Sequence, residues 1–469
     1  MPKRVVVDSR EVQKGDLFVG LQGEHVDGGK FAEQAAAAGA WGVVVRSEHG
    51  LGVASATGAR VRVFGVDDPL AALGSLARAW VDRLWAEGCK VIAITGSTGK
   101  TSTKDILTAM LRPHFEGAVR SSPRNFNTEV GLPLAVLGTE AGTRALVLEM
   151  AMRGPGQITE LCKIAPPEIG VITNVGPVHL ELLGTIEAVA EAKAELIAAL
   201  PPEGVCVVPA LAEALHPHLR KEIRTLTFAS RPEGGGGSLA EIVRVAGAAA
   251  DVRVLEAEPV ELNGRRGLRA EIAVGAARTV FEFNFRQAHN LVNALAAIAA
   301  GHAAEVPLES LAQGASQVRF SELRGEEIAL PDGAVVINDC YNANPISMRA
   351  ALDHLAEAAA EREAPRMIAV LGEMAELGPV GRDFHREIGA YAAEKGVDVL
   401  IAVGGLGDSY LEGYAAAGEA HRASDASEAA GLVGRLIAPG DVVLVKGSRS
   451  VGLETVANEL SNRYAQGAR

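Results

Sequence analysis

The residues with the clearest chemical purpose lie in the segment VIAITGSTGKTSTK, residues 91–104. Its apolar start is followed at once by Gly96 and Gly99, which allow a tight turn with N–H groups pointing inward. Lys100 would place a positive charge beside the outer phosphates of a nucleotide, and Thr101 would offer its hydroxyl to Mg²⁺. A helix starting here would direct its positive end at the anion. The segment therefore predicts a phosphate-binding loop.

The usual phosphate-loop pattern is met only in part, because Ile94 stands where its first glycine would be. A plain strand-to-helix turn is the alternative. That alternative does not account for a lysine placed directly after two glycines, so we expect a nucleotide site.

Two further polar residues follow predicted strands. Glu149 ends the strand ALVLE, and His179 lies on the loop after the strand IGVIT. Because the carboxyl ends of parallel strands face the ligand crevice, both could reach the same site, and the acid could hold Mg²⁺. A solvated strand-end glutamate and a structural histidine are the alternatives when each residue is taken alone.

Lys193 lies on the apolar face of the predicted helix EAVAEAKAELIAAL, four residues after Val189 and three before Leu196. Burial favours a neutral amine, which can react with CO₂ to form an anionic carbamate that binds Mg²⁺. The alternative is a buried stem with its ammonium in water, and the pattern alone favours this alternative.

A parallel sheet is needed to bring these residues together. Apolar strands are predicted at residues 91–95, 145–148, 169–173 and 205–208, with helical stretches between them. Strands that alternate with helices form parallel sheets, so the polar residues should meet at one edge.

The 469 residues suggest about three α/β domains. We expect a small N-terminal domain at 1–87 and a central P-loop-type domain at 88–313. The latter should have a mostly parallel sheet with an added antiparallel portion after a linker at 231–239, including a hairpin turn at Asn263–Gly264. Apolar strands are predicted again at residues 335–337, 367–371, 399–403 and 442–445, with helices between them. This alternation predicts a Rossmann-like doubly wound domain in 314–469.

Composition excludes several classes of protein. The net charge of −13 argues against a nucleic-acid partner bound through phosphate contacts. The four cysteines form no CxxC pair and show no zinc-site spacing. There is neither an 18-residue apolar run nor a signal-peptide segment, so we expect a cytoplasmic protein with no membrane span, and a monomer.

Several long motifs, in order along nearly the whole chain, resemble the Mur ligase family. DSREVQKGDLFVGLQGEHVDGGKF is similar to the family's UDP-sugar domain, and TGSTGKTSTK to its own, shortened phosphate loop. SPRNFNTEVGLPL, LEMAMRGPGQI, TNVGPVHLELLG and AHNLVNALAA resemble its central-domain motifs. In the third domain, INDCYNANPISM, VLGEMAELG and VLVKGSRS look like the member that adds D-alanyl-D-alanine, and the D-N-P-R motif expected of the diamino-acid-adding member is absent.

The resemblance implies roles for individual residues. ATP would contact Gly96, Ser97, Thr98, Gly99, Lys100, Thr101, Ser102, Asn290, Asn293, Arg324, Asp339 and Tyr341. Mg²⁺ would be bound by Thr101, Glu149, His179 and Lys193, the last as its carbamate. The catalytic residues would be Lys100, Lys193, His179, Asn127 and Thr128. The UDP-sugar would lie near Asp8, Ser9 and Arg10, and the incoming dipeptide near Lys446, Ser448 and Arg449.

The implied reaction is ATP-dependent ligation of UDP-N-acetylmuramoyl-tripeptide to D-alanyl-D-alanine through an acyl-phosphate. Its product would be the pentapeptide precursor of peptidoglycan, with consequences for cell wall, shape and division. Phosphoryl transfer depends mainly on placement and charge stabilisation, in keeping with the lack of a Ser–His or Cys–His signature. A ligase like folylpolyglutamate synthase would not be expected to carry the DSR…GDLF segment. A nucleotide-dependent switch is the alternative of another class, which the loop alone would allow.

Overall fold

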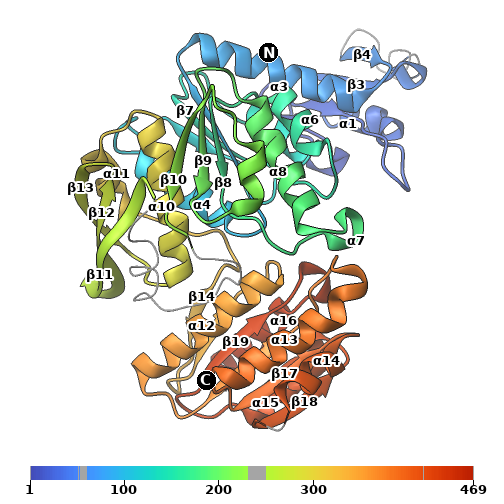
Figure 1. Ribbon diagram of the computed structural model, residues 1–469. Helices are drawn as coiled ribbons and strands as arrows, with labels where there is room; N and C mark the ends of the chain where they lie inside the picture. Colours follow the sequence, from blue (N-terminus) through green and yellow to red (C-terminus); the bar gives the residue numbers. More distant parts are fainter. Residues whose placement is uncertain are drawn as a thin grey trace.

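The computed structural model describes residues 2–50, 52, 61–230, 250–262, 264–415 and 417–467. The described chain forms three β-sheets of four, nine and six strands that follow one another in sequence, and Figure 1 shows helices around each. The expected three-domain α/β architecture is thereby confirmed. The predicted linker at 231–239 and residue Asn263 lie outside the described residues.

The first sheet is small and parallel, with the order β1-β2-β3-β4. Its strands are β1 (Val5–Val6), β2 (Leu17–Val19), β3 (Gly42–Arg46) and β4 (Arg62–Val66), and α1 (Ala32–Ala37) lies between β2 and β3 in the chain. The long helix α3 (Pro69–Ala86) follows, and the side chain of Asp68 caps its first turn. Because α3 packs against helices of the next sheet, it connects the two domains.

The central sheet has the order β13-β12-β11-β10-β9-β8-β5-β7-β6. Its strands are β5 (Lys90–Thr95), β6 (Val119–Ser121), β7 (Ala145–Glu149), β8 (Ile169–Ile172), β9 (Val205–Pro209), β10 (Arg224–Phe228), β11 (Val252–Leu262), β12 (Arg265–Val274) and β13 (Ala277–Phe283). Strands β5 to β10 pair in parallel, whereas β11, β12 and β13 pair antiparallel. The predicted antiparallel addition is therefore present, and Gly264 lies in the turn between β11 and β12.

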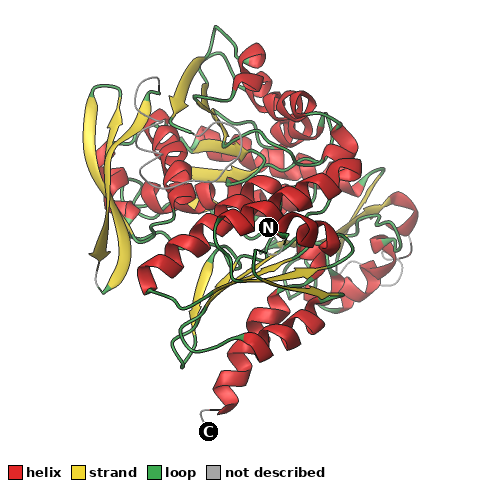
Figure 2. Cartoon of the chain, turned by 60° about the horizontal axis from the view of Figure 1, so that its bottom comes forward, coloured by secondary structure: helices red, strands yellow, loops and turns green. Residues whose placement is uncertain are grey.

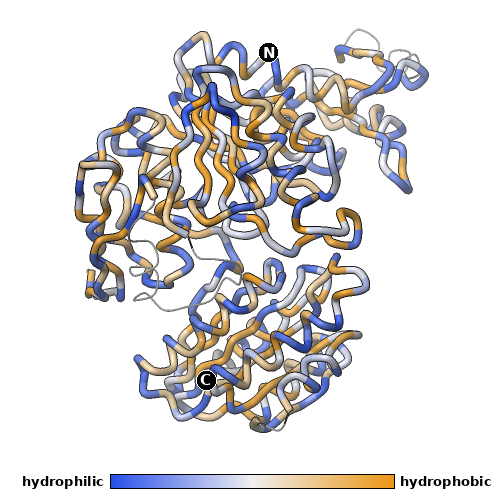
Figure 3. The backbone as a smooth tube through the Cα atoms, viewed as in Figure 1, coloured by the Kyte–Doolittle hydropathy of each residue, from blue (hydrophilic) through white to orange (hydrophobic). Residues whose placement is uncertain are grey.

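Two hydrophobic cores cover the two faces of the central sheet. One contains α4 (Lys100–Leu111), α10 (Ala288–Ala303) and α11 (Leu308–Ala315), and the other contains α3, α5 (Gly131–Leu137), α6 (Gln157–Ile164) and α8 (Ile186–Ala199). A strand covered on both faces needs apolar side chains on both, which explains the continuous apolar runs of β5, β7 and β8. Figure 3 shows these strands as a hydrophobic interior.

The third sheet has the order β14-β15-β19-β16-β17-β18, and only β14 runs antiparallel to its neighbour. The strands are β14 (Glu326–Ala329), β15 (Val335–Asn338), β16 (Met367–Leu371), β17 (Val399–Val403), β18 (Glu419–Ala423) and β19 (Val442–Lys446). One core holds α12 (Pro345–Arg362), α13 (Gly381–Glu394) and α14 (Gly407–Tyr414), and the other holds α15 (Ala426–Leu436) and α16 (Glu454–Gly467). Helices thus lie on both faces of the sheet (Figure 2), as the doubly wound prediction requires.

The domain boundaries proposed from sequence lie near helices that connect the sheets. The boundary at 87/88 follows the end of α3, and the boundary at 313/314 falls inside α11. Both boundaries stay predictions. Within the described ranges, no helix combines the length and hydropathy that a bilayer crossing requires.

Candidate active site between the central and C-terminal domains

A cavity of about 1000 Å³ lies between the central and C-terminal domains. Most of the residues expected to bind nucleotide or metal line it, although they come from distant parts of the chain. These are Ser97, Thr98, Gly99, Lys100, Thr101, Ser102, Asn127, Thr128, Glu149, His179, Asn290, Asn293, Arg324, Asp339, Tyr341 and Lys446. Gly96, Lys193, Asp8, Ser9, Arg10, Ser448 and Arg449 are not part of its lining.

The loop between β5 and α4 needs its two glycines. Gly96 has φ 149° and Gly99 has φ 80°, and a Cβ on Gly99 would lie 2.3 Å from Asn293 Oδ1. The N–H groups of Ser97 and Thr98 donate to the backbone and side-chain oxygens of Asn174, at 3.1 and 2.9 Å. These two N–H groups therefore face the neighbouring loop, whereas the sequence predicted that they would point toward a bound phosphate.

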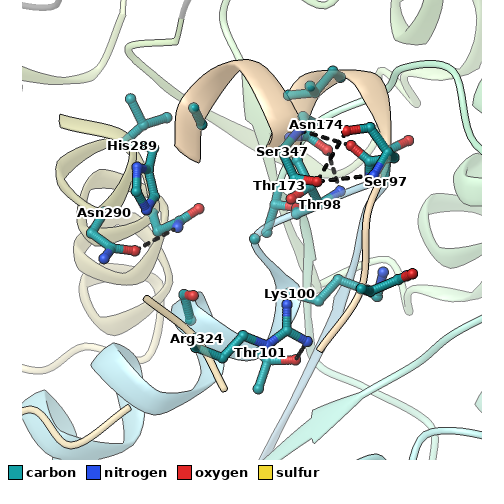
Figure 4. Close-up of a pocket in the computed structure, with 18 of the residues that line it drawn as sticks. Ser97, Thr98, Lys100, Thr101, Thr173, Asn174, His289, Asn290, Arg324 and Ser347 are labelled. Carbon is teal, nitrogen blue, oxygen red and sulfur yellow. Dashed lines mark hydrogen bonds between the residues drawn. The ribbon is translucent and has the colours of Figure 1, made fainter. Parts of the chain in front are cut away.

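The first turn of α4 is the part of the loop that suits an anion. Among the described residues no side chain caps this helix, so the N–H groups of its first turn have no side-chain acceptor there, while the turn lines the cavity. Lys100 is half-buried here, and its Nζ donates to Gly96 O at 2.7 Å. Figure 4 shows its side chain among the residues that line the cavity. Burial lowers the pKa of Lys100, whereas the charge of Glu149 raises it. A nucleotide phosphate would supply the negative charge that this ammonium needs.

Glu149 ends β7 and is buried, with both carboxylate oxygens engaged. Thr101 Oγ1 donates to Oε2 at 2.8 Å, and Asn127 Nδ2 donates to Oε1 at 2.8 Å. Arg324 comes from the C-terminal side and donates from Nη2 to Thr101 Oγ1 at 3.1 Å, the contact marked in Figure 4. A hydroxyl and a carboxylate held together at a phosphate loop are the oxygen ligands that Mg²⁺ prefers, so these residues fit the ion.

His179 precedes the short helix α7 (Leu180–Leu183) and has a left-handed backbone with φ 54°. Its Nδ1 contacts the carboxylate of Glu376, a residue of the C-terminal domain. Burial lowers the pKa of His179, and the charges of Lys193 and Lys100 lower it further, whereas the charge of Glu376 raises it. The electrostatic effects place these four side chains in one neighbourhood.

Lys193 is 2% exposed on α8, so the sequence prediction that it lies on the buried face is confirmed. It makes no hydrogen bond or ion pair with another described residue. Burial, and next the charge of Lys100, lower its pKa well below the usual value for lysine. This lowering favours the neutral amine, which is the form that reacts with CO₂ to give a carbamate.

The far end of the cavity is built from α10 and the start of the C-terminal domain. Asn293 Nδ2 donates to Asn290 Oδ1 at 3.2 Å, and Asn290 Nδ2 approaches Gln287 Oε1 at 3.4 Å. The guanidinium of Arg324 lies over the Tyr341 ring, 4.0 Å from its centre. These planar groups could stack on a flat base and bond its edge.

The residues expected near the dipeptide have internal partners. Lys446 is buried, and its Nζ donates to Asp339 Oδ2 at 2.6 Å and to Asn342 O at 3.0 Å. Ser448 Oγ accepts from the backbone N–H of Ala375 at 2.9 Å.

Arg449 pairs with Glu454 at 3.1 Å. In the first domain, Arg10 pairs with Asp8 at 2.6 Å and holds the pKa of that carboxyl near 2, while Ser9 Oγ lies 3.5 Å from Gln34 Oε1. The substrate roles expected of these residues stay predictions.

Two residues at the site were missed by sequence reasoning. Asn174 holds the phosphate loop, and its place directly after a predicted strand, next to Thr173, was the available signal. Glu376 contacts His179 although the two residues are 197 positions apart in the sequence. No local pattern could have revealed that contact.

Comparisons with known proteins cover nearly all of the chain. Family models match at residues 3–81 (Mur ligase family, catalytic domain), 94–301 (Mur ligase middle domain) and 322–449 (Mur ligase, glutamate ligase domain). A UDP-N-acetylmuramoyl-tripeptide–D-alanyl-D-alanine ligase of Bacillus subtilis is 34% identical over 97% of this chain and 92% of its own length. The ligase of the same name from Mycobacterium bovis is 37% identical over 97% and 91%.

Solved structures agree in fold over the full length. The MurF structure from Acinetobacter baumannii has a TM-score of 0.81 at 28% identity, covering 98% of this chain and 93% of that one. The MurF ligase of Thermotoga maritima in complex with ADP has a TM-score of 0.78 at 27% identity, covering 99% and 98%. On these matches, and on the geometry of its site, this chain belongs to the Mur ligase family.

Proposed function

We propose that this protein is an ATP-dependent ligase that joins D-alanyl-D-alanine to UDP-N-acetylmuramoyl-tripeptide. The observation that carries the proposal is the cluster of Thr101, Glu149 and Asn127 beside the uncapped start of α4, facing residues of the C-terminal domain across one cavity. The relatives named above support the choice of substrates, because they are 34% and 37% identical to this chain and each match covers 97% of it.

The reaction that suits this site begins at the terminal carboxylate of the tripeptide, which attacks the γ-phosphorus of ATP and forms an acyl-phosphate and ADP. Two anions must approach each other, so the Lys100 ammonium and the first-turn N–H groups of α4 would stabilise the charge on the transferred phosphoryl group. The dipeptide amine then attacks the acyl carbon, loses a proton, and phosphate departs. Asn127 and Thr128 line the cavity where these groups would meet.

The metal site would consist of Thr101, Glu149, His179 and Lys193. Mg²⁺ bound there would neutralise phosphate charge and orient the reacting oxygens. Glu149 is already positioned by Asn127 and Thr101, at 2.8 Å each. A carbamate on Lys193 would add a second anionic ligand in place of a buried amine that no other described residue pairs with.

The remaining cavity residues are assigned by the same reasoning. The adenine would lie against Asn290 and Asn293, while Arg324, Tyr341 and Asp339 would close over the nucleotide. The UDP group would bind the first domain near Asp8, Ser9 and Arg10, and the dipeptide near Lys446, Ser448 and Arg449. We further propose a monomer that works in the cytoplasm, where ATP and UDP-sugars are available, on the route to peptidoglycan.

The deciding experiment measures ADP and phosphate release from ATP and Mg²⁺, with the two other substrates supplied separately and together. Release that needs both, with a product heavier by the dipeptide, is the expected result. Release with the nucleotide sugar and a diamino acid would overturn the assigned amine. Release that depends on no amine would favour a nucleotide-dependent switch.

A further inference from the structure

A carboxylate of the C-terminal domain contacts His179 of the central domain. Glu376 lies between β16 and the 3-10 turn Gly378–Val380, and one of its oxygens contacts His179 Nδ1. Its other oxygen lies 3.3 Å from Arg153 Nε, and its backbone oxygen accepts from Glu181 N at 3.3 Å. Side chain and backbone thus both bind the central domain at the loop that carries His179.

The loop that carries Glu376 is held rigidly by its own domain. His385 is fully buried, donates from Nδ1 to Gly381 O at 2.6 Å, and accepts the N–H of Met374 at Nε2 at 3.0 Å. Ser448 accepts the N–H of Ala375, at 2.9 Å. Because the backbone is fixed on the two residues before Glu376, the position of its carboxylate follows the position of the whole domain.

Both partners have backbones that most residues avoid. His179 has φ 54° and Glu376 has φ 63°, in the left-handed region where a side chain other than glycine is uncommon. Such conformations persist where surrounding contacts over-determine them, and they concentrate at functional sites. Here two residues with this backbone conformation, one from each domain, contact each other through their side chains.

We infer that Glu376 is a positioning residue, which accepts the Nδ1 proton of His179 and so orients the ring with the lone pair of Nε2 free for a metal ion. Metal-binding histidines characteristically donate their other ring N–H to a carboxylate or carbonyl, which fixes the tautomer and the ring orientation. Since the carboxylate belongs to the C-terminal domain, the histidine is oriented only when that domain is docked. Docking and assembly of the metal site are therefore one event.

This inference rests on the proposed metal role of His179, so the experiment must test the two separately. Mn²⁺ affinity of the full chain in the presence of ADP, followed by electron paramagnetic resonance, reports on the metal site without turnover. The variants are H179A, E376A, E376Q and the double variant H179A/E376A. E361A is the matched control, because Glu361 is a C-terminal-domain carboxylate that contacts Arg286 and Arg266 of the central domain without reaching His179.

We expect E376A to weaken Mn²⁺ binding about 10-fold or more. E376Q should weaken it less, because its amide oxygen can still accept the Nδ1 proton. In the H179A background, E376A should cause no further loss of Mn²⁺ affinity, because the effects of two substitutions are not additive when one residue acts through the other. E361A should bind Mn²⁺ as the wild type does.

Three outcomes would overturn the inference. If H179A weakens Mn²⁺ binding and E376A does not, Glu376 has no positioning role, while the proposed function stands. If E361A causes as large a loss as E376A, the effect comes from domain docking in general. If H179A leaves the affinity unchanged, the metal role of His179 itself is wrong, and the inference falls with it.

Discussion

At the scale of single residues, Lys193 offers the sharpest test of the metal site. Its amine is buried, no other described residue forms a hydrogen bond or ion pair with it, and burial lowers its pKa well below the usual value, which favours the neutral form that reacts with CO₂. Replacing Lys193 by Ala should lower kcat by about 100-fold or more, because one anionic metal ligand is lost. A short carboxylate such as acetate or formate should restore part of the rate, since it can occupy the space of the carbamate.

The control for this prediction is Lys163→Ala. Lys163 is a 66%-exposed lysine on the neighbouring helix α6, where it pairs with Glu160. This variant should keep the wild-type rate and should not respond to acetate. A Lys193→Ala enzyme that turns over normally, or that no carboxylate rescues, would argue against the carbamate.

Single residues also show how much of the site could be predicted. Lys100, Thr101, Glu149 and His179 were predicted because each lies at the end of a strand or within a few residues after it, and strand ends meet at one edge of a parallel sheet. The burial of Lys193 followed from the spacing of its apolar neighbours.

The contacts that cross between domains could not be predicted in this way. The contact of His179 with Glu376 and that of Thr101 with Arg324 depend on how two independently folded sheets dock. No periodicity within either segment records that arrangement.

At the scale of elements, the turn between β5 and α4 should tolerate no side chain at residue 99. Gly99→Ala places a methyl group in the left-handed region, at a cost of about 1–2 kcal/mol, and also pushes it into Asn293. We therefore expect lower stability and weaker ATP binding, measured by thermal unfolding and by isothermal titration calorimetry.

Gly88→Ala separates the two effects. Gly88 has nearly the same φ, 83°, but a Cβ there would meet nothing within 4 Å. It should lose similar stability and keep its ATP affinity. Equal ATP affinity in both variants would show that Asn293 can move aside without consequence for the site.

The strands were predictable where both faces are covered. β16 and β17 were predicted with the bounds that the structure has, because five consecutive residues in each are apolar and almost all are buried. β4, β14 and β18 were missed, since they lie at sheet edges and read RVFGV, EEIA and EAHRA. Such edge strands form because a neighbouring strand pairs with them, and this pairing cannot be predicted from the sequence of the edge strand alone.

The edge strand β14 should make stability depend on pH through Glu327. Its carboxylate lies 2.5 Å from Arg362 Nη2 and 3.3 Å from His354 Nε2 of α12, and the His354 contact lowers its pKa to about 2. Because the pKa of Glu327 is lower in the folded protein than in the unfolded chain, where it is near 4.5, its carboxylate stabilises the fold at pH values above 4.5. This contribution is lost as the pH falls toward 2. Because water partly screens the pair, we expect about 1 kcal/mol.

Urea unfolding at pH 7 and again at pH 3 measures this contribution. Glu327→Gln should be less stable than the wild type at pH 7, and the difference should shrink at pH 3. Glu326→Gln is the matched control on the adjacent, exposed residue, and should behave as the wild type at both values. A difference for Glu327→Gln that is the same at both values would contradict the ion pair.

At the scale of the whole molecule, the cavity exists because two doubly covered sheets face each other across it. Each domain contributes groups that are incomplete alone: the central domain supplies the phosphate loop, and the C-terminal domain supplies Arg324, Tyr341 and Glu376. In the proposed reaction, closure of the two domains would exclude water from the acyl-phosphate and would complete the site at the same time. Variants at the junction should therefore change substrate affinity more than stability.

Arg324 is the residue with which this can be measured. Its guanidinium donates to Thr101 Oγ1 at 3.1 Å and lies 4.0 Å from the Tyr341 ring centre, so it joins the C-terminal segment to the hydroxyl that we propose as a metal ligand. Lysine keeps the charge but cannot both stack flat and donate sideways. Arg324→Lys should raise the KM for ATP about 10-fold, which corresponds to about 1.4 kcal/mol, and leave the melting temperature unchanged.

Arg349→Lys is the control, because Arg349 stacks on Tyr391 within the C-terminal domain, 4.7 Å from its ring centre, and is not part of the cavity lining. An unchanged KM in Arg324→Lys, or an equal rise in Arg349→Lys, would mean that Arg324 does not close the nucleotide site.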